Sequence, residues 1–170
     1  MAGYGLPKEQ HLSVVLQNSL ELEGHNIKII NGSVSGSTSA GGLNIAEWTL
    51  SENNIDLMIL CLGANDMLRG INPKETKNNL EEIIKIAKSK NIKIIIAGMI
   101  APTSYGFEYK KSFDKIFSDL SKKHKLQLIP FLLEGVAQKP EFNLSDGMHP
   151  NDQGTIIISN TLKKAILKNL

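Results

Sequence analysis

The chain has 170 residues, of which 41% are hydrophobic and 21% are charged, and its formal net charge at pH 7 is +2. These values are typical of a globular protein, and the length fits one domain, so wholesale disorder is excluded. The balance of nineteen Lys and Arg against seventeen Asp and Glu is too even to indicate a nucleic-acid or membrane-surface partner.

Helical and strand patterns alternate along the chain. In chain order, the sequence predicts a helix at 11–24, a strand at 26–31, a helix at 41–53, a strand at 55–62, a helix at 71–91, a strand at 92–100, a helix at 105–124, a strand at 125–131 and a helix at 151–170. The strands are apolar on both faces and helices join them, which indicates a parallel sheet between two helix layers. We therefore expect one α/β domain over residues 1–170.

Local signals mark several ends of these helices. The helix at 71–91 has Asn72 to cap it, Pro73 at its first position and Glu75 in its first turn. The stretch 11–24 ends at Gly24, and glycine commonly ends a helix there in the left-handed conformation. No apolar run reaches the roughly 18–20 residues that a bilayer-spanning helix needs. The stretch MAGYGLPKEQ does not have the pattern of a signal peptide.

Three polar segments containing glycine follow predicted strands, and the carboxyl ends of parallel strands are where ligands bind in such sheets. The segment SDGMHP places Asp146 three residues before His149, and Pro150 keeps His149 out of helical geometry. A carboxylate that fixes an imidazole makes it a general base toward a hydroxyl. The alternatives are a plain turn before the last helix, or a metal site that also uses Asp152.

The other two segments offer hydrogen-bond donors. In LGANDMLRG, the Asn65 amide can donate to a developing oxyanion and Gly63 lets the backbone come close, with Asp66 as a local cap. The alternative is that these residues only form a turn. In NGSVSGSTSAGG, the N–H of Gly36 is the best candidate for a second donor. The glycines do not fit a nucleotide-binding loop, because neither Gly-Lys-Ser/Thr nor Gly-x-Gly-x-x-Gly is present.

These three segments, in this order, resemble the SGNH (GDSL) hydrolase family. The likeness is closest to its bacterial branch of multifunctional thioesterase, lysophospholipase and arylesterase enzymes, and it extends into LRGINPKETKNNLEEII and IPFLLEGVAQKPEFNLSDGMHPN. The resemblance implies a three-layer, flavodoxin-like α/β/α fold with strand order 2-1-3-4-5. It also implies that His149 and Asp146 are catalytic and that Gly36 and Asn65 form the oxyanion hole.

The sequence departs from the family at its first block, Gly-Asp-Ser-Leu, which carries the nucleophilic serine at the end of the first strand. The family-like residues that follow that block are the AGYG of MAGYGLP, so we expect the serine two residues before Met1 and the central first strand before that. We expect the chain to be truncated there, and the 170-residue form to be inactive. A signal peptide upstream would make the protein periplasmic or secreted; without one it would be cytoplasmic.

The resemblance implies hydrolysis of carboxylic esters and thioesters with an acyl chain, lysophospholipids included, without a metal or an organic cofactor. By its position alone, APTSYGFEY is expected to shape the acyl groove. We expect a small-molecule substrate and no nucleic-acid partner, while the oligomeric state stays open. The rival hypotheses are a carbohydrate acetyl esterase of the same family and a non-catalytic, flavodoxin-like binding module.

Overall fold

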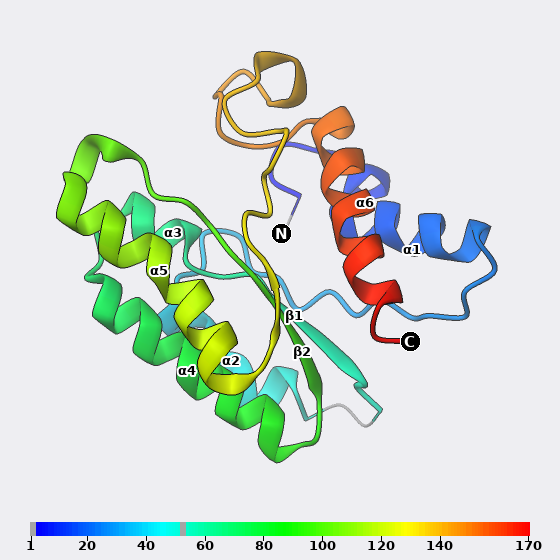
Figure 1. Ribbon diagram of the computed structural model, residues 1–170. Coiled ribbons are helices and arrows are strands. Elements are labelled where there is room, and N and C mark those ends of the chain that lie inside the picture. Colours follow the sequence, from blue (N-terminus) through cyan, green and yellow to red (C-terminus); the bar gives the residue numbers. More distant parts are fainter. Residues whose placement is uncertain (1–2, 52–53) are drawn as a thin grey trace. The chain divides into compact units, whose positions relative to one another are not determined.

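The computed structural model describes residues 3–51 and 54–170, which form two compact units (Figure 1). One unit combines Met1–Ser35 with Leu132–Leu170, and the other is Gly36–Phe131. The second unit contains the sheet, whereas the helices and loops of the first unit come from both ends of the chain.

The sheet of the second unit consists of β1 (Leu57–Leu60), β2 (Lys93–Ala97) and β3 (Gln127–Ile129), in the order β1-β2-β3 among the described residues. Both pairs of strands are parallel, with Ile59 opposite Ile95 and Ile96 opposite Leu128. The middle strand is buried from Ile94 to Ala97. The prediction of a parallel α/β fold is therefore confirmed.

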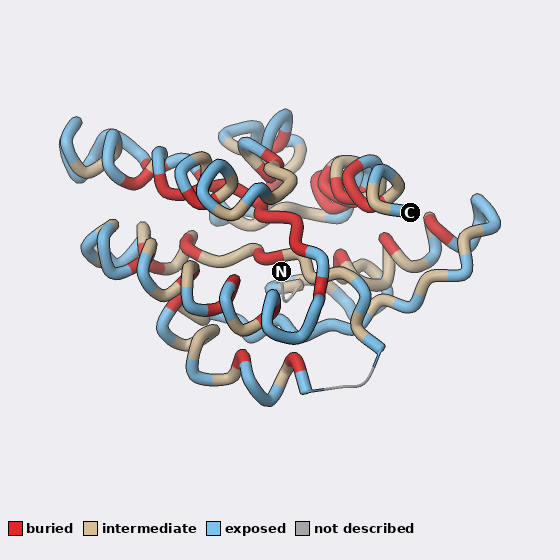
Figure 2. The backbone as a smooth tube through the Cα atoms, turned by 60° about the horizontal axis from the view of Figure 1, so that its bottom comes forward, coloured by how far each residue is buried: buried red, intermediate tan, exposed pale blue. Residues whose placement is uncertain are grey.

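Long helices connect these strands and pack beside them (Figure 1). Helix α4 (Pro73–Ser89) joins β1 to β2, and α5 (Phe107–His124) joins β2 to β3. The Asn72 side chain accepts a hydrogen bond from the backbone N–H of Lys74, as the sequence predicts for the start of α4. The buried positions of α4 recur along one side of the helix at 76, 80, 83, 84 and 87 (Figure 2), and this stripe packs α4 against α2 (Ser39–Thr49) and α5.

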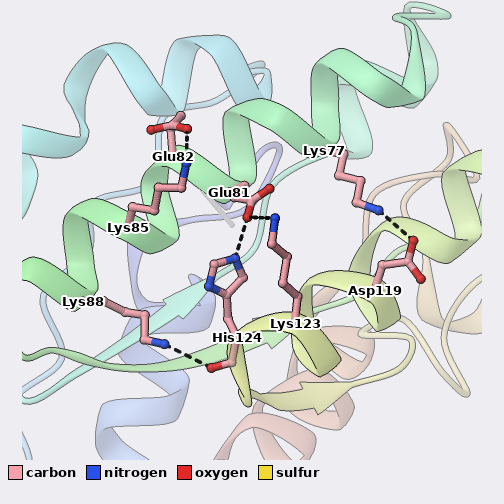
Figure 3. Close-up of polar contacts among 8 residues, drawn as sticks. All are labelled: Lys77, Glu81, Glu82, Lys85, Lys88, Asp119, Lys123 and His124. Carbon is pink, nitrogen blue, oxygen red and sulfur yellow. Dashed lines mark hydrogen bonds and ion pairs between the residues drawn. The ribbon is translucent and has the colours of Figure 1, made fainter.

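Ion pairs join the side chains of α4 to those of α5 near the protein surface (Figure 3). A carboxylate oxygen of Glu81 on α4 lies 2.6 Å from Nζ of Lys123 and 2.7 Å from Nε2 of His124 on α5. Hydrogen bonds from these two side chains, that from Lys123 first, lower the pKa of the Glu81 carboxyl. The Glu81 side chain is only 14% exposed, so the pairs help to fix how the two helices align.

The first unit is built around α1 (Leu12–Leu22) and α6 (Asp152–Leu167). It also contains the short 3-10 helices η1 (Lys8–Gln10) and η3 (Pro140–Phe142). Leu12, Leu16 and Leu20 are buried at a spacing of four on α1, which packs against α6. At the end of α1 the N–H of His25 donates to the carbonyl of Leu20, and Gly24 takes a positive φ of 81°. The predicted role of Gly24 is confirmed.

The predicted strand at 26–31 does not form. A strand needs a neighbour to accept and donate its backbone hydrogen bonds, and within the described residues of the first unit no strand runs beside this segment. The side chain of Gln17 replaces part of that neighbour: its amide nitrogen donates to the carbonyl of Ile27, and its oxygen accepts from the N–H of Ile29, both at 2.6 Å. The apolar pattern alone was therefore not sufficient for a strand.

Two further expectations change in detail. The loop expected after the strand at 55–62 contains a short helix, α3 (Ala64–Leu68), which follows Gly63 at a φ of 113°. A short 3-10 helix, η2 (Thr103–Tyr105), precedes α5. Among the described residues, none of the helices is long and apolar enough to cross a bilayer.

Candidate active site

Asp146 and His149 lie together in the turn that precedes α6. The Nδ1–H of His149 donates to Oδ2 of Asp146 over 2.7 Å. The other carboxylate oxygen, Oδ1, accepts the backbone N–H groups of Met148 and His149, both at 2.9 Å. One carboxylate therefore fixes both the backbone of the turn and the orientation of the imidazole, which leaves Nε2 as the nitrogen for proton transfer.

The local sequence accounts for this turn. Gly147 sits between the two residues at a φ of 69°, a conformation that glycine adopts without strain. The N–H of Leu144 donates to the carbonyl of His149 over 2.7 Å and closes the loop. Asn151 then caps α6 by accepting from the N–H of Gly154. Hydrogen bonds at both ends thus hold the loop between Leu144 and Asn151.

The Asp146 carboxylate is strongly stabilised in its charged form. Hydrogen bonds from the backbone N–H of His149, then from that of Met148 and from the His149 ring, lower the pKa of Asp146 to about 2. Because this value lies below the ordinary one, the carboxylate keeps its charge at neutral pH and loses these bonds only as the pH falls toward 2. It is therefore available to support an imidazolium at any pH at which the protein would work.

Gly36 and Asn65 lie in the second unit and are also close to one another. The Asn65 amide nitrogen donates to the carbonyl of Ser37 over 3.1 Å. The Arg69 guanidinium donates to the carbonyl of Gly36 over 2.9 Å, and Gly36 has a φ of 73°. The side chains of Asn65 and Arg69 therefore hold the loop that contains Gly36, and the Asn65 amide keeps a second N–H for another acceptor.

Gly63 is required where β1 passes into α3. Besides its positive φ, a Cβ atom at this position would lie 3.2 Å from the ring of Phe117, which is closer than such contacts usually are. This contact is with a packed side chain, so the approach of the Gly63 backbone to an oxyanion stays a prediction. Asn65 follows in the first turn of α3.

Asp66 has a larger role than the local cap predicted from the sequence. Its buried carboxylate accepts the N–H of Ser39 at 2.7 Å and the hydroxyl of Thr76 at 3.1 Å, and it also accepts the Ser39 hydroxyl. Asn79 donates to the Ser39 oxygen. Asp66 therefore binds the N-terminus of α2 and the first turns of α4 to α3, directly beside Asn65.

The four predicted site residues thus form two pairs, Asp146 with His149 in the first unit and Gly36 with Asn65 in the second. Asp152, the third residue of the alternative metal site, does not complete such a site, since the described part of the chain contains no group of three His, Cys, Asp or Glu residues arranged for a metal. Sequence reasoning missed Tyr4, whose ring lies against that of His149.

Comparison with known proteins gives a consistent result. A model of the GDSL-like Lipase/Acylhydrolase family matches residues 1–155. An arylesterase of Vibrio mimicus is 34% identical over 169 residues, which cover 99% of this chain and 84% of the relative. Thioesterase 1/protease 1/lysophospholipase L1 of Escherichia coli (strain K12) is 32% identical over 138 residues, covering 81% of this chain and 66% of the relative.

The solved structures agree with this assignment. The crystal structure of TesA superposes with a TM-score of 0.93 at 31% sequence identity and covers 99% of this chain and 94% of that one. The family match covers most of the residues, and the sequence relatives cover most of the chain at more than 30% identity. The chain therefore belongs to the GDSL-like lipase/acylhydrolase family.

Proposed function

We propose that this protein hydrolyses carboxylic esters and thioesters through an acyl-enzyme, with His149 as general base and acid and Asp146 as its partner. The observation that carries the proposal is the 2.7 Å hydrogen bond from Nδ1 of His149 to Oδ2 of Asp146. The family match and the esterase and thioesterase names of the relatives support the same chemistry. Membership of this family makes the protein an ester hydrolase of the serine type.

The nucleophile in this proposal is the serine of the family's Gly-Asp-Ser-Leu block, which the resemblance places directly before Met1. Its Oγ forms a bond with the carbonyl carbon of the ester while its proton passes to Nε2 of His149. The imidazolium then gives that proton to the leaving alcohol or thiol as the acyl bond breaks. Water repeats the sequence on the acyl-enzyme and releases the acid, so no metal or organic cofactor is needed.

The second pair supplies the oxyanion hole in this mechanism. The Gly36 N–H and the free N–H of the Asn65 amide donate to the carbonyl oxygen as it gains negative charge. The bond from Asn65 to the carbonyl of Ser37 supports this role, because it fixes the amide plane before substrate binds. The proposal thus assigns both pairs to one reaction.

We place the acyl chain of the substrate along the segment after β2. Tyr105 and Tyr109 donate their hydroxyl groups to the carbonyls of Leu68 and Ile71, which joins this segment to the end of α3. Leu68, Tyr105 and Phe107 remain exposed there, although apolar side chains gain from being covered. An acyl chain that covered them would bury apolar surface, which favours substrates with longer chains over acetyl esters.

The experiment begins with the DNA upstream of the Met1 codon. An in-frame Gly-Asp-Ser-Leu is expected there, and a stop codon directly before Met1 would remove this assignment of the nucleophile. The form extended by that segment is then assayed with p-nitrophenyl esters of two to twelve carbons and with acyl thioesters. We expect hydrolysis that increases with acyl length.

Two controls accompany this assay, namely the 170-residue chain and the extended form with the block serine replaced by alanine. Both should remain at background. An extended form that folds cooperatively but hydrolyses none of these substrates would contradict the proposal. Hydrolysis confined to acetylated sugars would instead favour a carbohydrate acetyl esterase.

A further inference from the structure

Tyr4 stands at the corner of a tight turn near the start of the chain. The N–H of Leu6 donates to the carbonyl of Gly3 over 3.1 Å, which closes a four-residue turn. Gly5 occupies the third position of this turn at a φ of 72°, the conformation that a type II turn requires there. The side chain of Tyr4 therefore projects from the corner of a turn with a defined shape.

The turn is packed closely on both sides. A Cβ atom on Gly3 would lie 2.2 Å from the ring of His11, and a Cβ atom on Gly5 would lie 2.7 Å from a methyl group of Leu144. Both glycines also have a positive φ, 73° and 72°, so a side chain at either position would be strained. Leu144 also donates its backbone N–H to the carbonyl of His149, so the turn that carries Tyr4 rests directly on the loop that carries His149.

This packing brings two rings together that are 145 positions apart in the sequence. The ring centroids of Tyr4 and His149 are 4.4 Å apart, with 33° between the ring planes. Tyr4 is 59% exposed, so its side chain adds little to the core of the unit. Its closest described ring partner is the imidazole whose Nδ1 is already bonded to Asp146.

We propose that Tyr4 is a positioning residue for His149, an inference that rests on the function proposed above. The hydrogen bond from Nδ1 to Asp146 fixes one edge of the imidazole, and the Tyr4 ring fixes one face, so the remaining freedom of the imidazole to rotate is small. The face of an aromatic ring also attracts a cation, which favours the imidazolium that forms when the serine gives up its proton. The aromatic ring is needed for both effects, whereas the Tyr4 hydroxyl is not.

The matched variants are Tyr4→Phe, which keeps the ring, and Tyr4→Leu, which keeps an apolar side chain without one. In proton NMR spectra of the 170-residue chain and of the extended form, the ring signals of His149 are identified by their loss in His149→Asn. Tyr4→Leu should move these signals, because the ring current of Tyr4 is removed, whereas Tyr4→Phe should leave them near their original positions. The signals of His124, which is paired with Glu81 in the other unit, serve as the internal control. Unchanged His149 signals in Tyr4→Leu would overturn the proposal.

Kinetics of the extended form provide the second readout. Tyr4→Leu should lower kcat for a p-nitrophenyl ester by about three- to tenfold, while KM stays within about twofold of the native value. Tyr4→Phe should keep the native kcat. Equal losses in both variants, or a change in KM alone, would overturn the positioning role. An extended form that folds but hydrolyses no ester would overturn the proposed function, and the catalytic role of Tyr4 with it, even if the His149 signals shift as expected.

Discussion

The Oδ1 and Oδ2 atoms of Asp146 have different tasks around His149. Oδ2 accepts from the imidazole Nδ1, while Oδ1 accepts two backbone N–H groups that shape the turn. An asparagine can keep the second task, because its amide oxygen also accepts hydrogen bonds. It cannot keep the first, because its NH2 group would face Nδ1 as a donor and favour the wrong tautomer.

Asp146→Asn should therefore preserve the fold and remove most of the activity. In the extended form we expect kcat to fall by on the order of 10⁴-fold at pH 7, where the native carboxylate is charged. Initial rates with a p-nitrophenyl ester check this, and Asp152→Asn, an exposed acid in the first turn of α6, is the matched control. A rate within tenfold of the native one would contradict the assigned role of Asp146.

Asn65→Ala should affect the reaction itself more than substrate binding. If its amide binds the oxyanion, kcat should fall by about 10²- to 10³-fold with little change in KM, since the bond strengthens only in the transition state. Asn160→Ala, at an exposed position on α6, should leave both constants unchanged. A rise in KM with a native kcat would mean that Asn65 binds substrate and does not stabilise the oxyanion.

The sequence predicted the contact between Asp146 and His149 but not the contacts around them. Asp146 and His149 are three residues apart in a turn, so their contact is local and residue spacing alone indicates it. Ser39 and Asp66 are 27 residues apart, and Tyr4 and His149 are 145 apart, so those contacts depend on tertiary packing that no local pattern encodes.

The missed strand has a similar explanation. The pattern at 26–31 is suitable for a strand, but a strand also needs a hydrogen-bonding neighbour, and the Gln17 side chain takes two of those bonds instead. The helix at 71–91 was predicted well because its capping residue, its proline and its apolar spacing are all local signals.

Asp66→Ala should destabilise the second unit strongly. The substitution leaves the N–H and hydroxyl of Ser39 and the hydroxyl of Thr76 buried without their common acceptor, and we expect a loss of about 2–4 kcal/mol. Urea denaturation measures it. Asp56→Ala, at an exposed position before β1, should change the stability by less than about 0.5 kcal/mol. If Asp66→Ala lowered the unfolding free energy as little as Asp56→Ala does, the hydrogen-bond network of Asp66 would not be needed for the fold.

Glu81 should make the α4–α5 contact sensitive to acid. Its pKa is lowered in the folded protein by Lys123 and then His124, so its contribution is complete above the ordinary value of 4.5 and is lost as the pH falls through the lowered value. Glu81→Gln should cost about 0.5–1 kcal/mol near pH 6, and the cost should shrink below about pH 4.

The neighbouring residue provides the control for this effect. Glu82 pairs with Lys85 on its own helix, and both side chains are about half exposed (Figure 3). Glu82→Gln should therefore change the unfolding free energy less than Glu81→Gln at pH 6. Two outcomes would contradict this account of the contact. One is an equal loss of unfolding free energy in both variants, and the other is a loss in Glu81→Gln that grows as the pH falls.

The imidazole of His149 is the group on which the whole mechanism depends. The most direct measurement compares initial rates of p-nitrophenyl ester hydrolysis by the extended form with those of its His149→Ala variant, after thermal unfolding has shown that both are folded. We predict that the variant falls to the rate of the uncatalysed reaction. A variant that retains the rate of the parent would contradict the assignment of His149 as the general base.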